Sequence, residues 1–447
     1  MANTYISRSN ASGTSTQKGT ISVWIKSSEE PSGNNQTTLA SWGDANNHGA
    51  LLWNGSDKID AFDYQSGYAS QLQTNALLRD CSAWYHIVYS WDTTLATAND
   101  RQKIYINGVE QGYATRTNYS VNATTSWNAN SYSMRVGALN SSSYFRGSMS
   151  HIHFIDGIQY PASTFGSTDA TSGIWTINTS PSVTSYGTNG FFILKDGNTI
   201  TDSSPNSNNF SLGGGTLTNT QDCPDNNYPS VNINTGKATE YLNSTGLRYG
   251  NTQINQAGNN AVFISTLANT TGKYYWEMLI DAVGYTTQGI ITYDALIQNG
   301  GGTYLYTPAT GYGYVYTGNK GNNNSQVSYG ASYTSGDYIS VAFDQTNGSI
   351  WFAKNGAWQN SATTAEIGAG TTTNSAYSSM PTNGEFYAAA FGLDNNAVTS
   401  INYGNGTFGT TTLSTTYSPT VGDTGAKFKY NIIPTGFTAI STKGYNA

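Results

Sequence analysis

Apolar and polar side chains alternate over short stretches along most of the chain, which is the period-two pattern of β-strands. In residues 19–26, Ile21, Val23 and Ile25 occupy every second position. Residues 84–91 form a stronger apolar run. Apolar residues at the spacing of a helix are nearly absent. The pattern therefore predicts an all-β protein with almost no helix.

Both halves of the chain contain a hairpin of similar construction. A strand that ends at Asp92 is followed by a connector and by a second strand that closes at Asn107-Gly108. In the second half, a strand that ends at Asp344 turns at Asn347-Gly348 and returns to Asn355-Gly356. Asn and Gly tolerate the positive φ angles that tight hairpin turns require. The shared construction favours two β-sandwiches in one chain.

A polar, turn-rich stretch separates the two halves. It contains residues 206–209, the glycines Gly213 to Gly215, and residues 221–227. Clusters of Gly, Asn, Asp and Pro mark loops and linkers. We place the boundary near residue 225 and expect two β-sandwich (jelly-roll) domains in tandem. The expected parts are 1–224, with a C-terminal extension from about 160, then 225–433, and a C-terminal tail over 434–447.

Charged residues are scarce, and this limits the functions to consider. Lys and Arg number 19 and Asp and Glu 26, or 10% of 447 residues, whereas an ordinary soluble domain carries about 25%. The net charge is −7 and no run of Lys or Arg occurs, so a nucleic-acid partner is not expected. No apolar run approaches the roughly 18 residues of a membrane span, so membrane insertion is not expected.

The N-terminal residues and the cysteines both bear on the compartment in which the protein is made. Residues 1–8 are polar and lack the apolar core of a secretory signal. Cys81 and Cys223 lie far apart with no Cys-x-x-Cys motif, so we expect two reduced thiols. A chain made in a bacterial cytoplasm fits both observations.

Carboxylate spacing argues against catalysis. A retaining glycosidase needs two carboxylates about 5–5.5 Å apart, and alternate strand positions would supply them. Of the glutamates only Glu29 and Glu30 are neighbours, and adjacent strand residues face opposite ways. Asp57, Asp60 and Asp63 have a three-residue spacing that does not share a strand face, and we interpret them as solvated loop residues. No Gly-x-Ser-x-Gly motif occurs. The sequence predicts a protein that is not an enzyme.

Metal ligands are few. His151 and His153 would share a strand face, but no third zinc ligand is evident, and His86 fits a packed strand residue. Calcium is the one cofactor candidate. The turn at residues 43–48 offers oxygen ligands from Asp44, Asn46 and Asn47, with a simple Asx-rich turn as the alternative.

Tyrosines near polar loops suggest carbohydrate binding. Sugars stack their C–H faces on aromatic rings and pair their hydroxyls with amides and hydroxyls, groups that this sequence has in excess. The alternative is that these rings fill a core or face a neighbouring subunit. The candidate contacts are Tyr64, Tyr68, Trp127, Tyr132 and Tyr144 in the first half, and Tyr304, Tyr306 and Tyr329 in the second.

Several motifs resemble known families. Trp84-Tyr85-His86-Ile87-Val88, Asp92 and residues 103–108 resemble the hairpin of concanavalin A-like, laminin-G-like jelly rolls. The second half is similar to SPRY domains through residues 272–277, 311–314, 336–339 and 348–356. The segments that resemble virion proteins of tailed bacteriophages are 5–8, 21–26, 154–157, 164–166, 173–175, 186–191, 202–210 and 434–442.

The resemblance implies a non-catalytic structural protein of a tailed-phage virion, a tail-fibre or appendage adhesin that binds host-surface glycans or receptors. Its expected location is the virion, and its expected partners are other virion proteins and a host glycan or receptor. Related jelly rolls often hold calcium, and fibres are commonly homotrimers, so a homo-oligomer is expected. The alternatives are an architectural subunit of collar, capsid or tail without receptor contact and, less favoured, a polysaccharide depolymerase.

Overall fold

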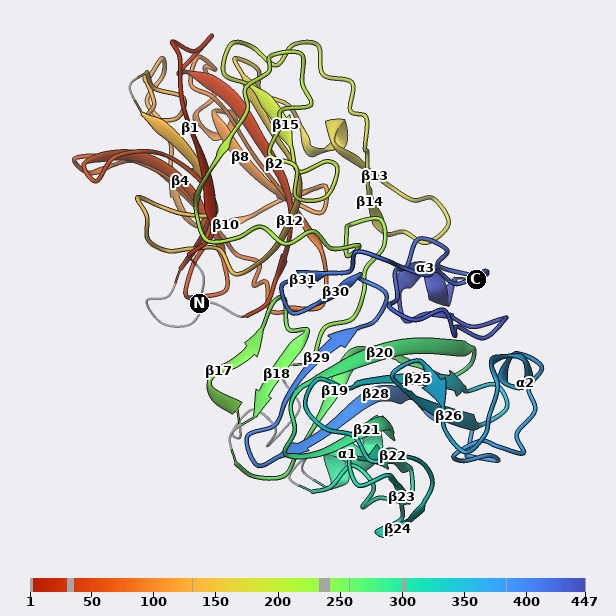
Figure 1. The fold of residues 1–447 in the computed structure, drawn as a ribbon. Helices are drawn as coiled ribbons and strands as arrows, with labels where there is room; N and C mark the ends of the chain where they lie inside the picture. Colours follow the sequence, from red (N-terminus) through yellow and green to blue (C-terminus); the bar gives the residue numbers. More distant parts are fainter. Residues whose placement is uncertain are drawn as a thin grey trace. The chain divides into compact units, whose positions relative to one another are not determined.

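The computed structural model describes residues 3–29, 36–130, 132–232, 242–256, 258–299, 303–382 and 384–446. The chain divides into two compact units, Met1–Leu217 and Thr218–Ala447, each built from β-sheets (Figure 1). Unit 2 begins before residue 225, where the sequence predicts the boundary. The reason is that the preceding residues already pair within this unit, since Gln221 N donates to Asn405 O at 3.0 Å.

Unit 1 is a sandwich of an eight-stranded and a six-stranded antiparallel sheet. The eight-stranded sheet has the order β10 (Tyr113–Thr117), β6 (Tyr68–Thr74), β5 (Ile59–Gln65), β4 (Asn47–Trp53), β3 (Thr37–Gly43), β11 (Ser133–Val136), β1 (Tyr5–Ser9) and β16 (Ser211–Gly214). The six-stranded sheet has the order β15 (Phe191–Ile193), β12 (Gly147–Asp156), β2 (Lys18–Ser27), β7 (Tyr85–Asp92), β8 (Gln102–Ile106) and β9 (Val109–Glu110). Outside these sheets lie η1 (Ala98–Asp100), η2 (Ala162–Thr164) and the pair β13 (Gly166–Thr168) and β14 (Trp175–Ile177).

The core of unit 1 lies between its two sheets and is rich in aromatic rings. Ile21, Val23 and Ile25 point into it from β2, as the alternation predicts. Trp42 and Trp91 are almost completely buried in the same core. Large aromatic side chains bury 150–250 Å² each, so a few of them supply much of the apolar area that stabilises this sandwich.

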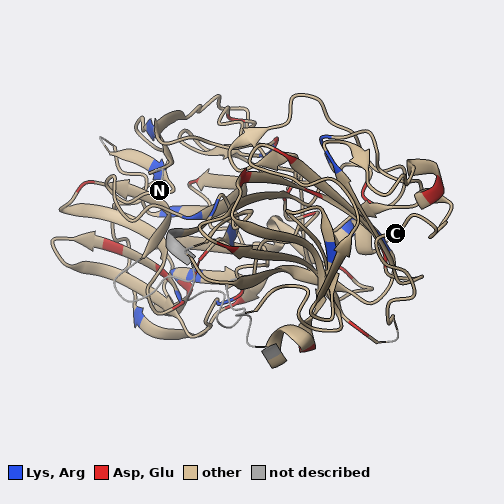
Figure 2. Cartoon of the chain, turned by 60° about the horizontal axis from the view of Figure 1, so that its bottom comes forward, with Lys and Arg blue, Asp and Glu red and all other residues tan. Residues whose placement is uncertain are grey.

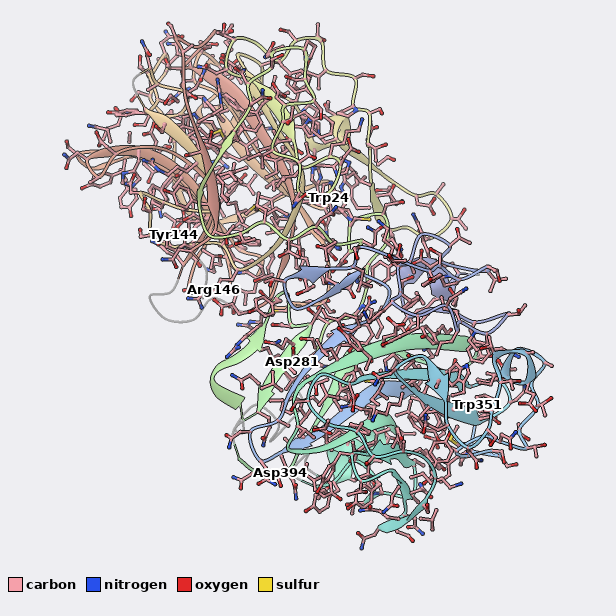
Figure 3. All side chains as sticks on the ribbon, in the orientation of Figure 1. Trp24, Tyr144, Arg146, Asp281, Trp351 and Asp394 are labelled. Carbon is pink, nitrogen blue, oxygen red and sulfur yellow. The ribbon has the colours of Figure 1, made fainter. Side chains whose placement is uncertain are left out.

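Residues after β12 cover the outer face of the six-stranded sheet. Phe165 packs with Val88 and Ile155, and Trp175 contacts the same cluster. Strand β2 is therefore buried on both faces, including Trp24, which Figure 3 labels among the side chains of unit 1. The extension that the sequence places from about residue 160 is a third layer of unit 1.

Unit 2 is a second sandwich, again of two antiparallel sheets. One sheet has the order β17 (Leu242–Arg248), β18 (Gln253–Gln256), β29 (Val398–Asn402), β20 (Lys273–Ala282), β25 (Tyr338–Asp344), β26 (Ser349–Lys354) and β27 (Ala357–Trp358), with β32 (Thr438–Ala439) parallel to β20. The other has the order β19 (Ala261–Asn269), β28 (Tyr387–Asp394), β21 (Tyr285–Thr292), β22 (Gly311–Val315), β23 (Asn319–Asn322) and β24 (Ser325–Ser328). A small pair, β30 (Thr407–Phe408) and β31 (Thr411–Thr412), stands apart from both sheets.

The C-terminal segment belongs to the body of unit 2. Phe437 and Ala439 are fully buried in the same core as Trp351, which Figure 3 labels in the interior of this unit. The Asp423 carboxylate ties this segment to the start of the unit. Its Oδ2 accepts hydrogen bonds from Tyr228 Oη at 2.6 Å and Ser441 Oγ at 2.7 Å. Residues 434–446 are thus packed structure, although the sequence suggests a tail.

In the part of the chain that the structure describes, α-helix is confined to three short segments, α1 (Tyr293–Asn299), α2 (Thr364–Gly368) and α3 (Thr442–Tyr445). The expected all-β fold of two tandem sandwiches with almost no helix is confirmed. Among the described residues, no helix has the length and apolar character needed to cross a membrane.

Candidate functional site

The outer face of the eight-stranded sheet in unit 1 carries the candidate site. Successive strand residues point to opposite sides, so Asp60, Phe62 and Tyr64 of β5 share the face turned away from the core. Ile59 and Ala61 point inward to the core. The same face receives side chains from β4 and β6, which flank β5.

Four rings form the aromatic part of this face. Tyr68 lies 5.6 Å from both Phe62 and Tyr64 between ring centroids, edge to face with each. His48 stacks on Tyr64 at 5.4 Å, because β4 pairs these two residues. Phe62 is buried beneath its neighbours, whereas Tyr68 is 57% exposed. The rings therefore form a supported, solvent-accessible platform.

A carboxylate and two amides continue the platform along β5 and β6. Gln71 Nε2 donates to both oxygens of Asp60, at 3.2 and 3.0 Å, and Gln73 Nε2 donates to Oδ2 at 3.4 Å. Asp60 is only 6% exposed, and burial raises its pKa while these amide hydrogen bonds oppose the rise. Hereafter the aromatic–amide face means His48, Asp60, Phe62, Tyr64, Tyr68, Gln71 and Gln73.

This combination suits a sugar ring. An aromatic platform accepts the C–H face of a pyranose, and the adjacent carboxylate and amides offer hydrogen-bond acceptors and donors for its hydroxyls. In the described ranges, no Lys or Arg forms an ion pair with Asp60. Figure 2 shows the few charged residues of the chain scattered over strands and loops. The face is therefore chemically matched to polar, uncharged ligands.

The two strand aspartates differ from the expectation of solvated loop residues. Both Asp60 and Asp63 lie within β5 and are buried. Asp63 points to the opposite side from Asp60, where its Oδ2 accepts hydrogen bonds from Ser126 N at 3.0 Å and Tyr119 Oη at 3.2 Å. Only Asp57 lies in a turn, paired with Arg79. The prediction that Asp60 and Asp63 do not share a face is correct.

In the turn proposed to bind calcium, the Asp44 side chain is hydrogen-bonded within the turn itself. Asp44 Oδ1 accepts the backbone N–H groups of Asn46 and Asn47, both at 2.8 Å. These two hydrogen bonds make the connection between β3 and β4 an Asx turn. Among the described residues, no group of three or more His, Cys, Asp and Glu gathers, His151 and His153 included. The residues present do not fit a calcium site, which needs six to eight oxygen ligands.

The other predicted sugar contacts of unit 1 lie elsewhere. Trp127 is fully buried, with its ring 5.5 Å from Trp42 and Trp91, so its prediction as a surface contact is wrong. A tryptophan in a polar connection can turn inward, and this one fills the core. Tyr132 and Tyr144 are partly exposed. Tyr144 packs against Tyr5, 6.0 Å away.

In unit 2, too, some of the tyrosines predicted as sugar contacts are buried and one is partly exposed. Tyr329 is buried in the core, where it contacts Tyr314 and Phe352, so its prediction as a sugar contact is wrong. Tyr304 and Tyr306 are stacked on one another at 5.4 Å. Tyr306 is buried, and Tyr304 is partly exposed.

Of the residues on this candidate face, the sequence analysis names Tyr64 and Tyr68 as candidate sugar contacts and does not name Asp60, Gln71 or Gln73. A signal for them exists, because Asp60, Phe62 and Tyr64 follow the period of a strand, as do Gln71 and Gln73.

The fold defines the class of the protein, a tandem of two β-sandwiches. Comparison with known families gives the particular modules. Residues 1–162 match the concanavalin A-like lectin/glucanases superfamily, and residues 273–406 match the SPRY domain. The chain thus contains a concanavalin A-like domain followed by a SPRY domain.

Several solved structures match parts of the chain at low identity. The SPRY domain of human HERC1 is 15% identical, with a TM-score of 0.29, and the match covers 38% of this chain and 96% of that one. Domain 4 of AbnA, a GH43 extracellular arabinanase from Geobacillus stearothermophilus solved with arabinotriose, is 19% identical, with a TM-score of 0.25, over 35% of this chain and 68% of that one. No relative was found among curated proteins.

Proposed function

We propose that this protein is a non-catalytic structural component of a tailed-phage virion, a tail-fibre or appendage adhesin. In this proposal it binds a host-surface glycan through the aromatic–amide face. Its partners are that glycan and other virion proteins, and it acts as a homo-oligomer located on the virion.

One observation carries the binding part of the proposal. Tyr68, an exposed ring, and Tyr64, a partly exposed one, lie on the same sheet face as a carboxylate that two amides hold in place. Rings without polar neighbours would serve packing equally well, and polar groups without rings would serve solvation. The combination at one surface is what recognition of a sugar requires.

The non-catalytic part rests on the same geometry. Hydrolysis of a glycoside by the usual mechanisms needs two carboxyl groups that flank the bond. Asp60 brings one carboxyl group to the face. Of the two aspartates three residues away, Asp63 points to the core side of β5, and Asp57 is paired with Arg79. This arrangement supports binding rather than cleavage.

The proposal that this is a phage virion protein rests on sequence resemblance. The segments that carry the resemblance include residues with clear structural roles. In the segment 202–210, Asp202 Oδ1 accepts hydrogen bonds from Phe192 N and Ser204 N, both at 2.8 Å. Its Oδ2 accepts one from Asn208 N at 2.7 Å. This carboxylate holds the segment against β15, so the resembling residues build the fold.

Weak sites repeated in an oligomeric appendage gain strength through avidity.

The test is adsorption of the purified protein to host cells and to a glycan array. The double variant Tyr64→Ala/Tyr68→Ala should reduce adsorption at least about tenfold, because each ring contributes a stacking contact worth about 1 kcal/mol. Tyr249→Ala, which removes a similarly exposed tyrosine from unit 2, is the matched control. Undiminished adsorption by the double variant would contradict the proposed site.

An architectural subunit is the second candidate, and one observation favours it. Tyr293, Ile297 and Phe386 of unit 2 are 49%, 54% and 57% exposed, and Tyr293 N donates to Phe386 O at 3.3 Å. Exposed apolar clusters of this kind often mark protein contacts. Cryo-electron microscopy of the virion separates the candidates, since a distal tip position supports adhesion and a position buried in collar, capsid or tail supports architecture.

The depolymerase alternative has its own test. Incubation with host envelope polysaccharide should release no oligosaccharides.

A further inference from the structure

Residues 161–186 form a thin layer over the outer face of the six-stranded sheet in unit 1, and we call them the cover. They include η2, β13 and β14 (Figure 1). Most of these residues are exposed. Phe165 belongs to a small apolar cluster with Val88 and Ile155 of the sheet. No residue of the cover, all of which the structure describes, contributes to the main core between the two sheets.

The sheet itself fixes both ends of the cover. β12 ends at Asp156 and β15 begins at Phe191, and Phe154 pairs with Phe191 across these strands. The chain therefore leaves the sheet and returns to it at neighbouring positions. A surface loop whose ends lie close together can move away without unpairing a strand. Because the cover has few buried apolar contacts, its local opening should cost less free energy than global unfolding.

Among the described residues, two side-chain hydrogen bonds join the cover to the six-stranded sheet, and each ends on an imidazole. Trp175 Nε1 donates to Nδ1 of His86 at 3.0 Å, and Tyr186 Oη lies 3.0 Å from Nδ1 of His153. Both imidazoles are buried. A backbone bond from Asp156 N to Tyr186 O, at 3.0 Å, adds to them at the end of the cover. The attachment of the cover thus depends on two of the four histidines in the chain.

A protonated imidazole does not fit the contacts of His86. The indole N–H of Trp175 can only donate, so Nδ1 of His86 must offer a lone pair. A proton on this nitrogen would set two N–H groups against each other. The other nitrogen, Nε2, faces the neutral Ser22 Oγ at 2.8 Å. An imidazolium here would therefore lose its bond to the cover and remain buried without a counter-ion, which is costly.

The charged groups nearby do not compensate such a charge. In the described residues, no ion pair involves His86 or His153. Burial lowers the pKa of both rings, and the neighbouring His151 and His86 lower that of His153 further. Asp169, the one charged residue of the cover, is exposed and accepts a hydrogen bond from Ser172 N in its own turn. The other charged or titratable groups on the elements packed around the two rings are Lys18, Lys26, Asp92, Asp100, Lys103, Tyr105, Glu110, Asp156, Tyr160, Lys195 and Asp202.

We infer that the cover is an acid-sensitive element, which detaches from the six-stranded sheet in mild acid while the sandwich stays folded. In the detached state both histidines are in water, where each binds its proton near pH 6.5. Each histidine then shifts the equilibrium toward detachment by about tenfold per pH unit below that value. Detachment uncovers Val88 and Ile155, so the protein gains an apolar surface. The inference goes beyond the proposed function, because it does not involve the aromatic–amide face.

The test is hydrogen–deuterium exchange of the full chain at pH 7 and pH 5, with rates corrected for the intrinsic effect of pH. The open fraction of the cover should rise at least about a hundredfold at pH 5, because two histidines titrate. Peptides from β2 and β7 should keep their protection. Binding of the dye ANS should increase at pH 5 with an unchanged far-UV circular dichroism spectrum, and the increase should reverse at pH 7.

His86→Gln/His153→Gln should remove most of the acid response, because glutamine does not titrate. His86→Gln alone should make the response at least about tenfold smaller, and it replaces the double variant if that protein does not fold. His48→Gln, which removes a histidine from the other sheet, is the matched control and should respond as the unmodified chain does.

Equal protection of the cover at both pH values would overturn the inference. So would a loss of protection in β2 and β7 together with the cover, or a full acid response in a folded variant that lacks His86. Adsorption by the Tyr64→Ala/Tyr68→Ala protein tests the aromatic–amide face separately, so the two proposals can fail independently.

Discussion

Trp175 Nε1 donates a hydrogen bond to Nδ1 of His86 at a distance of 3.0 Å. Because this nitrogen accepts, the proton of neutral His86 resides on Nε2, which faces Ser22 Oγ at 2.8 Å. Trp24 stacks on the other ring face at 4.8 Å. The extension of unit 1 is therefore attached to the six-stranded sheet through an imidazole that is both buried and uncharged.

Acid should destabilise unit 1 through this histidine. Complete burial lowers the pKa of His86 to about 3, and burial also lowers the pKa of His153. The unfolded chain, with histidine pKa values near 6.5, then binds more protons than the native chain, so stability falls as pH drops below about 6.5. The loss should reach about 1.4 kcal/mol per pH unit for each histidine. Urea unfolding between pH 7 and pH 4 measures it, and a flat profile would contradict the buried neutral state.

Trp175→Phe should lower the stability of unit 1 without altering its fold. The variant keeps an aromatic ring in the cluster but leaves His86 Nδ1 buried without a donor, a loss of about 1–3 kcal/mol. Urea unfolding followed by circular dichroism gives the value. Ile174→Ala is the control, because Ile174 is exposed and should change stability by less than about 0.5 kcal/mol.

Asp60→Asn should weaken glycan binding without lowering the stability of unit 1. The buried Asp60 carboxylate has a raised pKa, so its ionised form weakens the native state at neutral pH, and an amide removes that cost. Gln71 can rotate its amide to offer oxygen to the new NH₂ group. We expect equal or higher thermal stability at pH 7, together with about tenfold weaker glycan adsorption. The stability difference should disappear below pH 4, and undiminished adsorption would remove Asp60 from the binding site.

Glu277→Gln should destabilise unit 2. Glu277 is fully buried, and its two oxygens accept hydrogen bonds from Lys429 N at 2.7 Å and Tyr430 N at 3.0 Å. Burial raises the pKa of Glu277 to about 7, so a glutamine removes the cost of a buried charge, as at Asp60. Its NH₂ group, however, would face one of these backbone N–H donors, which cannot rotate away as the Gln71 amide can. We expect this mismatch, worth about 1–3 kcal/mol, to outweigh the gain. Glu385→Gln, at a partly exposed position of the same unit, is the control for urea unfolding. Equal stabilities would mean that the segment shifts to accommodate the amide.

Calcium removal should have no effect. Since Asp44 Oδ1 is engaged by the N–H groups of its own turn, EDTA should leave the melting temperature unchanged. A decrease that added Ca²⁺ reverses would show that this turn, or another part of the chain, binds the ion.

The fold could be predicted from sequence where the alternation of apolar and polar residues has a single explanation, a β-strand. The pattern in residues 19–26 corresponds to β2, Lys18–Ser27. The pattern does not reveal that Trp24, on the supposed outer side, is buried, or that Val88 of the same sheet packs with Phe165 of the extension. Such covering depends on tertiary contacts that short-range periodicity does not record.

The candidate site was predictable in part for a related reason. Tyr64 and Tyr68 stand out as rings beside a polar turn, whereas Asp60 resembles the many aspartates of loops. Trp127 and Tyr329 show the opposite error, since a polar connection can direct its ring inward. Burial, which decides between these outcomes, is a property of the folded surface.

The Asp423 carboxylate has a mechanical consequence. It joins Tyr228, near the start of unit 2, to Ser441 in the C-terminal segment, so the two ends of this unit leave from one place. A pulling force applied between them would load a few hydrogen bonds at Asp423 before it reached the sandwich. These few bonds are therefore among the first contacts of unit 2 that tension between its two ends would break.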